Sequence, residues 1–168
     1  MRTARGEMIW VLRLIATIAV AIFAGCATPD AEQWAIDMTP VRPVPGLQVR
    51  VSHDVGYWLT VDVANASGRM ARLVWDDSSI VSSDGQASRA IRGETRKIAT
   101  ATNQPSIPIP SGASVKAGFI SERYVGQAAL TRIRPPPGKS DPRIRVVLAF
   151  DIDGQRSYFE AEGRFRKI

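Results

Sequence analysis

The feature that most constrains the fold is an alternation of large apolar residues near the end of the sequence. They occupy every second position from 144 to 152, at Ile144, Val146, Leu148, Phe150 and Ile152. A period of two is typical of a strand that buries one face. Asp153-Gly154 follows and favours a two-residue turn in which both residues have positive φ. We therefore predict a β-hairpin around residues 153 and 154.

The pattern also predicts the register of this hairpin. It sets Ile152 opposite Gln155, Leu148 opposite Phe159, and Val146 opposite Ala161. The outward set is then Tyr158, Glu160, Glu162 and Arg164. A slip by one residue would bury these charges and expose the phenylalanines, so the register is strongly specified.

A second hairpin is predicted nearer the start. Leu47, Val49 and Val51 alternate with polar residues, and Tyr57, Leu59, Val61 and Val63 do the same. Pairing His53 with Tyr57 puts Val51 opposite Leu59 and Val49 opposite Val61, with both apolar sets on one face.

The region between the hairpins contains shorter strand candidates separated by turn signals. They cover residues 71–75, 78–82, 86–92 and 114–121, and prolines at 105, 108 and 110 favour an edge or crossover segment before the last of them. No helical pattern of useful length follows the first 26 residues. The expected fold is all-β: an immunoglobulin-like sandwich of about seven or eight antiparallel strands over residues 47–168.

Composition limits the kinds of site that the chain can hold. One His and one Cys exclude most multi-ligand metal sites and a disulfide framework. Lys and Arg exceed Asp and Glu by 22 to 16. These cations are scattered and are not clustered with aromatic residues, so we do not expect nucleic acid as a partner.

The first residues have the outline of a secretory signal peptide. Arg2, Arg5 and Arg13 precede an apolar stretch at 14–23. This stretch is shorter than the roughly 20 apolar residues that a membrane-spanning helix needs. A signal helix that is later removed is therefore the preferred interpretation.

Phe23-Ala24-Gly25-Cys26 resembles the lipobox of bacterial lipoproteins, with Phe23 where that family usually has Leu. The resemblance implies cleavage between Gly25 and Cys26, a diacylglyceryl thioether on Cys26, and further acylation, for example with palmitate, of its new amino group. Two or more acyl chains hold a protein stably on a membrane. Ala27 and Thr28 follow in place of Asp, which by the same resemblance favours the outer membrane, facing the periplasm.

Three segments are therefore expected: a signal peptide at 1–25, the lipidated Cys with an extended tether at 26–46, and the β-domain at 47–168. The tether contains Pro29, Pro40, Pro43 and Pro45. Proline at this density favours extended chain. Trp34, Ile36 and Met38 alternate within it, a pattern that would allow part of the tether to dock on the domain but does not decide whether it does.

A second resemblance involves turn and core residues in the middle of the chain. Residues 65–67, 73–76, 84–85 and 107–112 are similar to a group of β-domains found in bacterial lipoproteins. That group carries no assigned activity, so the resemblance implies fold and location only.

Three motifs with possible chemistry each have a simpler structural explanation. His53 falls on the buried face of its strand, and no Ser lies in a Gly-x-Ser-x-Gly turn that would complete a nucleophilic site. Asp76 and Asp77 are expected in a turn, where they would accept backbone N–H bonds. Asp151-Ile152-Asp153-Gly154 is similar to the start of a calcium loop but lacks its later ligands, so the hairpin is preferred. We expect no catalytic residue, metal or cofactor.

Trp58 and Tyr158 fall on the outward faces of their strands. Together with Arg145 and Arg156 they form the only interaction patch that the sequence suggests. We favour the alternative, in which the second sheet or the tether near Trp34 covers these aromatic side chains.

The leading hypothesis is a membrane-anchored envelope lipoprotein that acts as a noncatalytic binding or assembly module, with an envelope protein or cell-wall component as its partner. Two alternatives remain open. One is an envelope hydrolase that uses His53, and the other is a soluble periplasmic binding protein.

Overall fold

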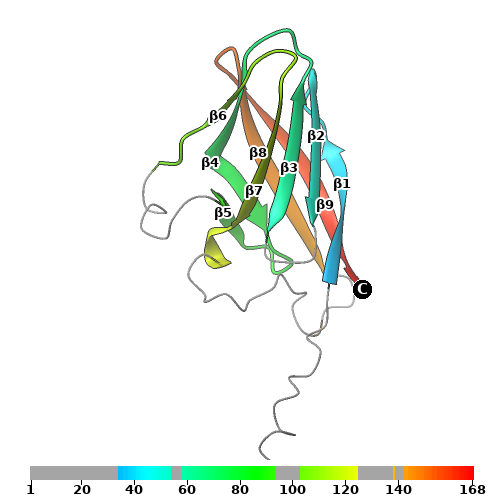
Figure 1. Ribbon diagram of the computed structural model, residues 1–168. Coiled ribbons are helices and arrows are strands. Elements are labelled where there is room, and N and C mark those ends of the chain that lie inside the picture. Colours follow the sequence, from blue (N-terminus) through cyan, green and yellow to red (C-terminus); the bar gives the residue numbers. More distant parts are fainter. Residues whose placement is uncertain (1–33, 54–57, 94–102, 125–137, 139–141) are drawn as a thin grey trace, which may run out of the picture. The chain divides into compact units, whose positions relative to one another are not determined.

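The computed structural model describes residues 34–53, 58–93, 103–124, 138 and 142–168. They form an all-β structure, as the alternating pattern predicts (Figure 1). The strands are β1 (Trp34–Arg42), β2 (Leu47–His53), β3 (Leu59–Asn65), β4 (Ala71–Val81), β5 (Ala87–Arg92), β6 (Ile107–Ile109), β7 (Ser114–Ser121), β8 (Arg143–Ile152) and β9 (Gln155–Lys167), and a short 3-10 helix η2 (Glu122–Tyr124) follows β7. Within these ranges no helix is long and apolar enough to cross a membrane.

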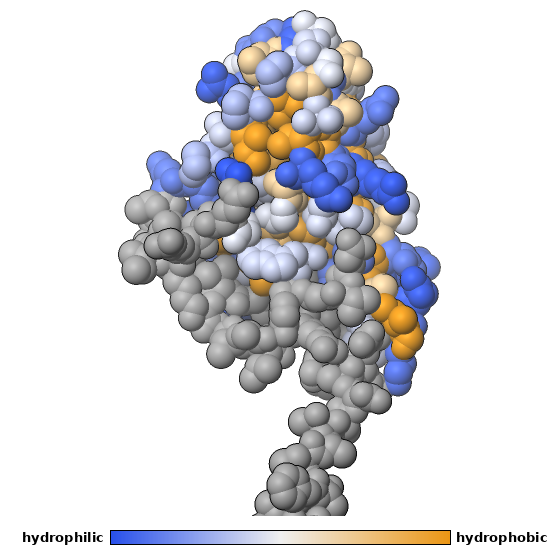
Figure 2. Space-filling view, viewed as in Figure 1, coloured by the Kyte–Doolittle hydropathy of each residue, from blue (hydrophilic) through white to orange (hydrophobic). Residues whose placement is uncertain are grey.

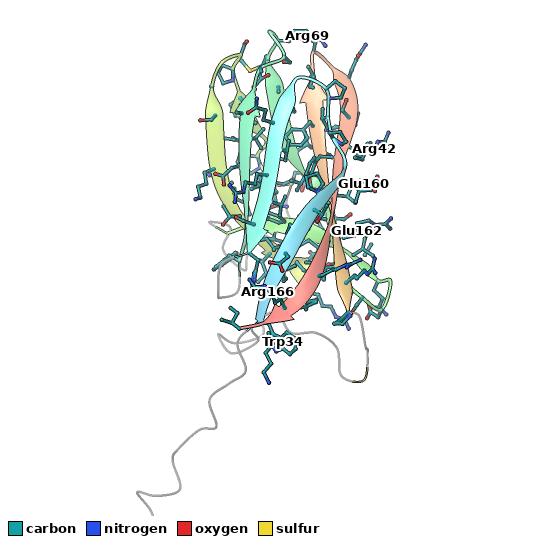
Figure 3. The ribbon with its side chains drawn as sticks, turned by 90° about the vertical axis from the view of Figure 1, so that its right-hand side faces the viewer. Trp34, Arg42, Arg69, Glu160, Glu162 and Arg166 are labelled. Carbon is teal, nitrogen blue, oxygen red and sulfur yellow. The ribbon has the colours of Figure 1, made fainter. Side chains whose placement is uncertain are left out.

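The nine strands form one antiparallel sheet in the order β1-β9-β8-β4-β5-β7-β3-β2, with β6 paired to β4. β5 joins the two halves of this order, because its residues 87–89 pair with β4 and its residues 90–92 pair with β7. The sheet curls until its end strands, β1 and β2, lie side by side (Figures 1 and 3). No hydrogen-bonded pairing joins these two described strands, so the sheet is nearly closed.

The interior holds one apolar core to which both halves of the sheet contribute. Its largest fully buried side chains are Trp75, Phe119, Phe150, Phe159, Leu59, Leu73, Ile91, Ile109 and Leu148. The rings of Trp75 on β4 and Phe119 on β7 meet across the interior, with their centroids 5.7 Å apart. Burial of side chains of this size is the main stabilising contribution to such a fold.

The C-terminal hairpin has the predicted register. Ile152 pairs with Gln155, Leu148 with Phe159 and Val146 with Ala161. Asp153 and Gly154 have φ values of 50° and 80°, as the tight turn requires. The carboxylate of Asp151 accepts the backbone N–H of Gly154 at 2.8 Å, so it caps this turn.

The hairpin of β2 and β3 has the predicted faces but a different register. His53 pairs with Leu59, not with Tyr57, which places Val51 opposite Val61 and Val49 opposite Val63. A shift of two residues leaves every side chain on its original face, because the side-chain period of a strand is two. The pattern therefore determined the faces but not the register.

The prediction of a turn at Asp76 and Asp77 is wrong, because β4 runs through both residues. The pairing of β4 with β8 shifts between Val74 and Ser79. Ser78 bridges this irregularity: its buried hydroxyl donates to the carbonyl of Val74 at 2.7 Å and accepts the N–H of Ala149 at 3.0 Å. One serine thus replaces the backbone hydrogen bonds that the bulge interrupts.

Residues 34–42, within the segment expected to be an extended tether, form strand β1 and pair with the last strand, β9. Ile36 is buried, and Val44 after the strand belongs to the core. Gly163 on β9 makes this close packing possible, because a Cβ added there would lie 2.5 Å from both Ile36 Cγ2 and Met38 Sδ. The β-structure therefore begins before residue 47.

Asn65 holds together the loops at one end of the sheet. Its side-chain amide donates to the carbonyls of Arg69 and Ile109, each at 2.7 Å. Its carboxamide oxygen accepts both the backbone N–H and the hydroxyl of Ser67. This buried residue thereby connects the turn after β3 with the end of β6.

Candidate interaction face

The outer surface of β2, β3 and β7 is the most promising candidate for binding. Alternation along these strands sends one residue in two outward, and Trp58 just before β3 has the same parity as Thr60. We call this surface the Trp58 face; its members are Gln48, Arg50, Ser52, Trp58, Thr60, Asp62, Ala64, Ser114, Lys116 and Gly118. It faces the viewer in Figure 1, and Figure 2 shows hydrophobic surface over it bordered by hydrophilic side chains.

A row of three charged residues crosses the Trp58 face. Arg50 on β2 pairs with Asp62 on β3, and Asp62 pairs with Lys116 on β7. Opposite charges in such cross-strand positions are close enough to interact. Among the ion pairs and hydrogen bonds of the described residues, however, none uses any of these three side chains. Each of these three charges is therefore without an ion-pair partner among the described residues.

A shallow hollow of about 460 Å³ lies beside this row. Its lining combines apolar residues (Val49, Val63, Ala64 and Val115), polar residues (Gln48 and Ser114) and the three charged residues. Small-molecule sites in proteins have volumes of roughly 300–1,000 Å³ and a similar mixture of apolar walls with a few polar groups. The hollow is thus large enough for one ring-sized group of a ligand.

Trp58 lies against the backbone on the same face and remains 43% exposed. A Cβ on Gly93 would come within 3.1 Å of its ring carbon Cζ3, so the indole packs directly on this glycine. Gly93 in turn donates its N–H to the carbonyl of Gly118 on β7 at 2.8 Å. The ring is therefore supported by the sheet while part of its surface stays available.

The structure does not bring together the four residues of the patch that the sequence suggests. Tyr158 is exposed on β9 and Arg145 lies on β8, whereas Trp58 belongs to the half of the sheet formed by β2, β3 and β7. Arg156 is bound to Asp77, with Nη2 and Oδ2 2.9 Å apart. Trp58 and Tyr158 are both exposed, so the alternative in which they are covered does not hold.

Sequence reasoning missed Arg50, Asp62 and Lys116. The strand parity already placed Arg50 and Asp62 outward, so the signal for a charged row was present in the pattern. The third member needed the pairing of β3 with β7, two strands that are far apart in the chain.

The outer surface of β1, β9, β8 and β4 has a different arrangement of charges, and we call it the paired face. Its ion pairs are Arg42–Glu160, Arg143–Glu162, Arg156–Asp77 and Arg166–Asp37, with N–O distances from 2.9 to 3.8 Å. Figure 3 shows Arg42, Glu160, Glu162 and Arg166 along β1 and β9. Four of its arginines therefore contact carboxylates, whereas Arg72, Arg145 and Arg164 on the same surface form no ion pair among the described residues.

His53 lies at the end of β2 and is only 8% exposed, so the partly buried position expected from its parity is confirmed. It lines a groove of about 350 Å³ between the edge strands β1 and β2, together with Asp37, Met38 and Val51. Among the described residues, no group of three His, Cys, Asp or Glu side chains is arranged to hold a metal ion.

Comparisons with known proteins give no identity. No family model and no curated protein matches the sequence. One similar solved structure is the X-ray structure of target SoR45 of the Northeast Structural Genomics Consortium. It is 10% identical with a TM-score of 0.34, over 83% of this chain and 88% of that one.

Gly25 and Cys26, the predicted cleavage and lipidation residues, lie outside the described residues.

Proposed function

We propose that the chain is a lipoprotein of the bacterial cell envelope whose β-domain acts as a noncatalytic binding or assembly module. The Cys26 motif supports the anchor, and acyl chains on this residue hold the domain at a membrane. Ala27 and Thr28 after it favour the outer membrane, on its periplasmic side. The partner in this proposal is an envelope protein or a cell-wall component.

The Trp58 face is the observation that best supports a binding role. Trp and Arg are enriched at recognition surfaces, because each offers a large contact area together with a polar group. Here an exposed Trp58 shares one surface with Arg50, Lys116 and a hollow. A binding module at a membrane acts through high local concentration near its partner.

The immunoglobulin-like sandwich is the finer part of the proposed fold. The division of β5 between β4 and β7 supports it, because the division creates two groups of strands with the core between them. A crystal structure in which these groups pack face to face, with strands inclined by about 30°, would agree with a sandwich. A continuous, evenly curved barrel would contradict it.

The anchor is tested by mass spectrometry of the protein purified from membranes. We expect a chain that begins at Cys26 and carries acyl chains, together with palmitate labelling that disappears in Cys26→Ser and persists in the control Thr28→Ala. An unmodified thiol or an uncleaved leader would refute the assignment. Release by osmotic shock without detergent would favour the soluble periplasmic alternative.

The binding role is tested by photo-crosslinking in cells. A photoreactive amino acid at Thr60 probes the Trp58 face, and one at Val147 probes the paired face. We expect a reproducible adduct from position 60 that is absent from position 147. Equal adducts from both positions, or none from either, would contradict binding through the Trp58 face.

A further inference from the structure

The charge order of the Trp58 face restricts the chemistry of its ligand. Arg50 and Lys116 flank Asp62 in one cross-strand row, so their Cα atoms lie about 10 Å apart. A single small anion placed between the two cations would meet the Asp62 carboxylate. The row therefore suits a ligand with separate anionic groups at its two ends and a hydrogen-bond donor between them.

The position of Trp58 adds a requirement for the length of the ligand. Trp58 precedes Asp62 by four positions, which corresponds to about 13 Å along an extended chain. A ligand that touches both the indole and the charged row must therefore be elongated. The hollow with Ala64 and Ser114 in its lining extends the surface further in the same direction.

The scarcity of apolar anchors argues against a protein partner on this face. The large exposed hydrophobic residues of the described chain are Val41, Trp58, Met70, Tyr158 and Ile168. Only Trp58 lies on the Trp58 face. A stable protein interface buries about 800 Å² on each side and has a central cluster of anchors. One indole and a hollow with some apolar walls, set among hydroxyl, amide and charged groups, fit a sugar better, because a sugar ring combines apolar C–H surface with many hydroxyls.

We infer that the Trp58 face binds a polysaccharide that carries carboxylate groups. Arg50 and Lys116 donate hydrogen bonds to two carboxylates of the glycan, and Asp62 accepts a hydrogen bond from a sugar hydroxyl between them. The apolar C–H surface of a sugar ring packs on Trp58. This inference rests on the proposed binding function and specifies the chemical class of its ligand.

Titration calorimetry with the full-length protein in detergent micelles tests the ligand class. The probe is an oligogalacturonate, which has a carboxylate on each ring, and its methyl ester is the matched uncharged probe. We expect the acid to bind with an affinity that falls as salt increases. The ester should bind at least about tenfold more weakly, because hydrogen bonds to charged groups are the stronger ones.

Paired substitutions test the site. Arg50→Gln combined with Lys116→Gln should weaken binding of the acid by about tenfold or more. The control is Arg145→Gln combined with Arg164→Gln, which removes the same charge from the paired face and should leave affinity unchanged. Trp58→Ala should weaken binding more than Trp58→Phe, which keeps a ring.

Asp62→Ala separates specific recognition from simple attraction between opposite charges. Loss of this carboxylate makes the face more positive, so charge attraction alone would tighten binding of the acid. We expect weaker binding, because the acceptor for a sugar hydroxyl is lost. Circular dichroism of every variant shows whether the β-fold is retained.

Three results would overturn the inference: no binding of the acid by the native protein, equal affinity for acid and ester, or an equal loss in the control pair. None of them bears on the mass of the N-terminal cysteine. Failure of the glycan inference is therefore distinguishable from failure of the lipoprotein assignment.

Discussion

The paired face and the Trp58 face are built from the same kind of strand but use their charges differently. On the paired face, Arg42 and Arg156 contact carboxylates of the same surface. On the Trp58 face, Arg50 and Lys116 lie next to Asp62 in register, yet they form no ion pair with it. Cross-strand register therefore brings charges near one another, but it does not by itself make them bond.

The physical reason for the difference is that exposed charged side chains interact with water as well as with each other, and that only some of them are positioned to make contact. An exposed ion pair gains little free energy because water screens it, so a side chain pairs only where geometry favours contact. Sheet twist brings diagonal neighbours together on the paired face, as for Arg143 and Glu162. On the paired face four arginines contact carboxylates, whereas no member of the row Arg50, Asp62 and Lys116 forms an ion pair among the described residues.

The largest expected effect comes from disrupting the strand that completes the paired face. Gly163→Val adds side-chain atoms where Ile36 and Met38 already pack. We expect a loss of up to about 3 kcal/mol in the free energy of unfolding, because overpacking forces strained side chains or backbone shifts. Urea denaturation measures the loss, and hydrogen exchange should show β1 losing protection first.

The matched control is Gly118→Ala on the Trp58 face, where an added Cβ meets open space. Its free energy of unfolding should lie within about 0.5 kcal/mol of the native value, as for most surface substitutions. If Gly163→Val were as harmless as this control, the packing of β1 on β9 described above would be incorrect.

The next effect concerns the bulge beneath the paired face. Ser78→Ala removes a buried hydroxyl that satisfies the carbonyl of Val74 and the N–H of Ala149. We expect destabilisation by about 1–2 kcal/mol, because two buried backbone groups lose a partner. Ser114→Ala on the exposed Trp58 face should change stability little, and equal losses in both variants would show that Ser78 is not a bridge.

A smaller effect is expected from the charges themselves. A double-mutant cycle for Arg156→Gln and Asp77→Asn should give a coupling of about 0.5 kcal/mol, the usual size for exposed pairs. The same cycle for Arg50→Gln and Asp62→Asn should give a coupling near zero. A larger coupling on the Trp58 face would remove the contrast between the two surfaces.

The smallest effect lies in the turn between β4 and β5, outside both faces. The Ser82 hydroxyl, the Gln86 backbone N–H and the Arg123 guanidinium hold the pKa of Asp84 well below its usual range. The pKa of Asp84 is therefore lower in the folded state than in the unfolded state. Its ionised carboxylate stabilises the fold fully above the unfolded pKa of about 3.9, and this stabilisation is lost as the pH falls towards the folded pKa. Asp84→Asn should remove this part of the acid sensitivity in thermal unfolding between about pH 5 and pH 2. If the thermal stability of Asp84→Asn depended on pH as that of the native protein does, Asp84 would not contribute to the acid sensitivity.

The candidate surface was only partly predictable from the sequence. Parity correctly placed Trp58 and Tyr158 outward, because a side chain's face depends on neighbours in the same strand. Their separation into different halves of the sheet depends on strand order, which no local pattern encodes. For the same reason Lys116 could not be assigned to the row with Arg50 and Asp62 before β3 was known to pair with β7.

The sequence by itself determined the all-β class, the inward and outward faces of the main strands, and the full register of the C-terminal hairpin. A period of two and an Asp-Gly turn act over a few residues, so they are readable locally. Only the tertiary structure decided that Trp34–Arg42 joins the sheet, that β4 continues through Asp76 and Asp77, and which charges become neighbours. Each of these depends on contacts between distant segments, such as β1 with β9 and Ser78 with Ala149. Their free energy arises only when the chain brings those segments together.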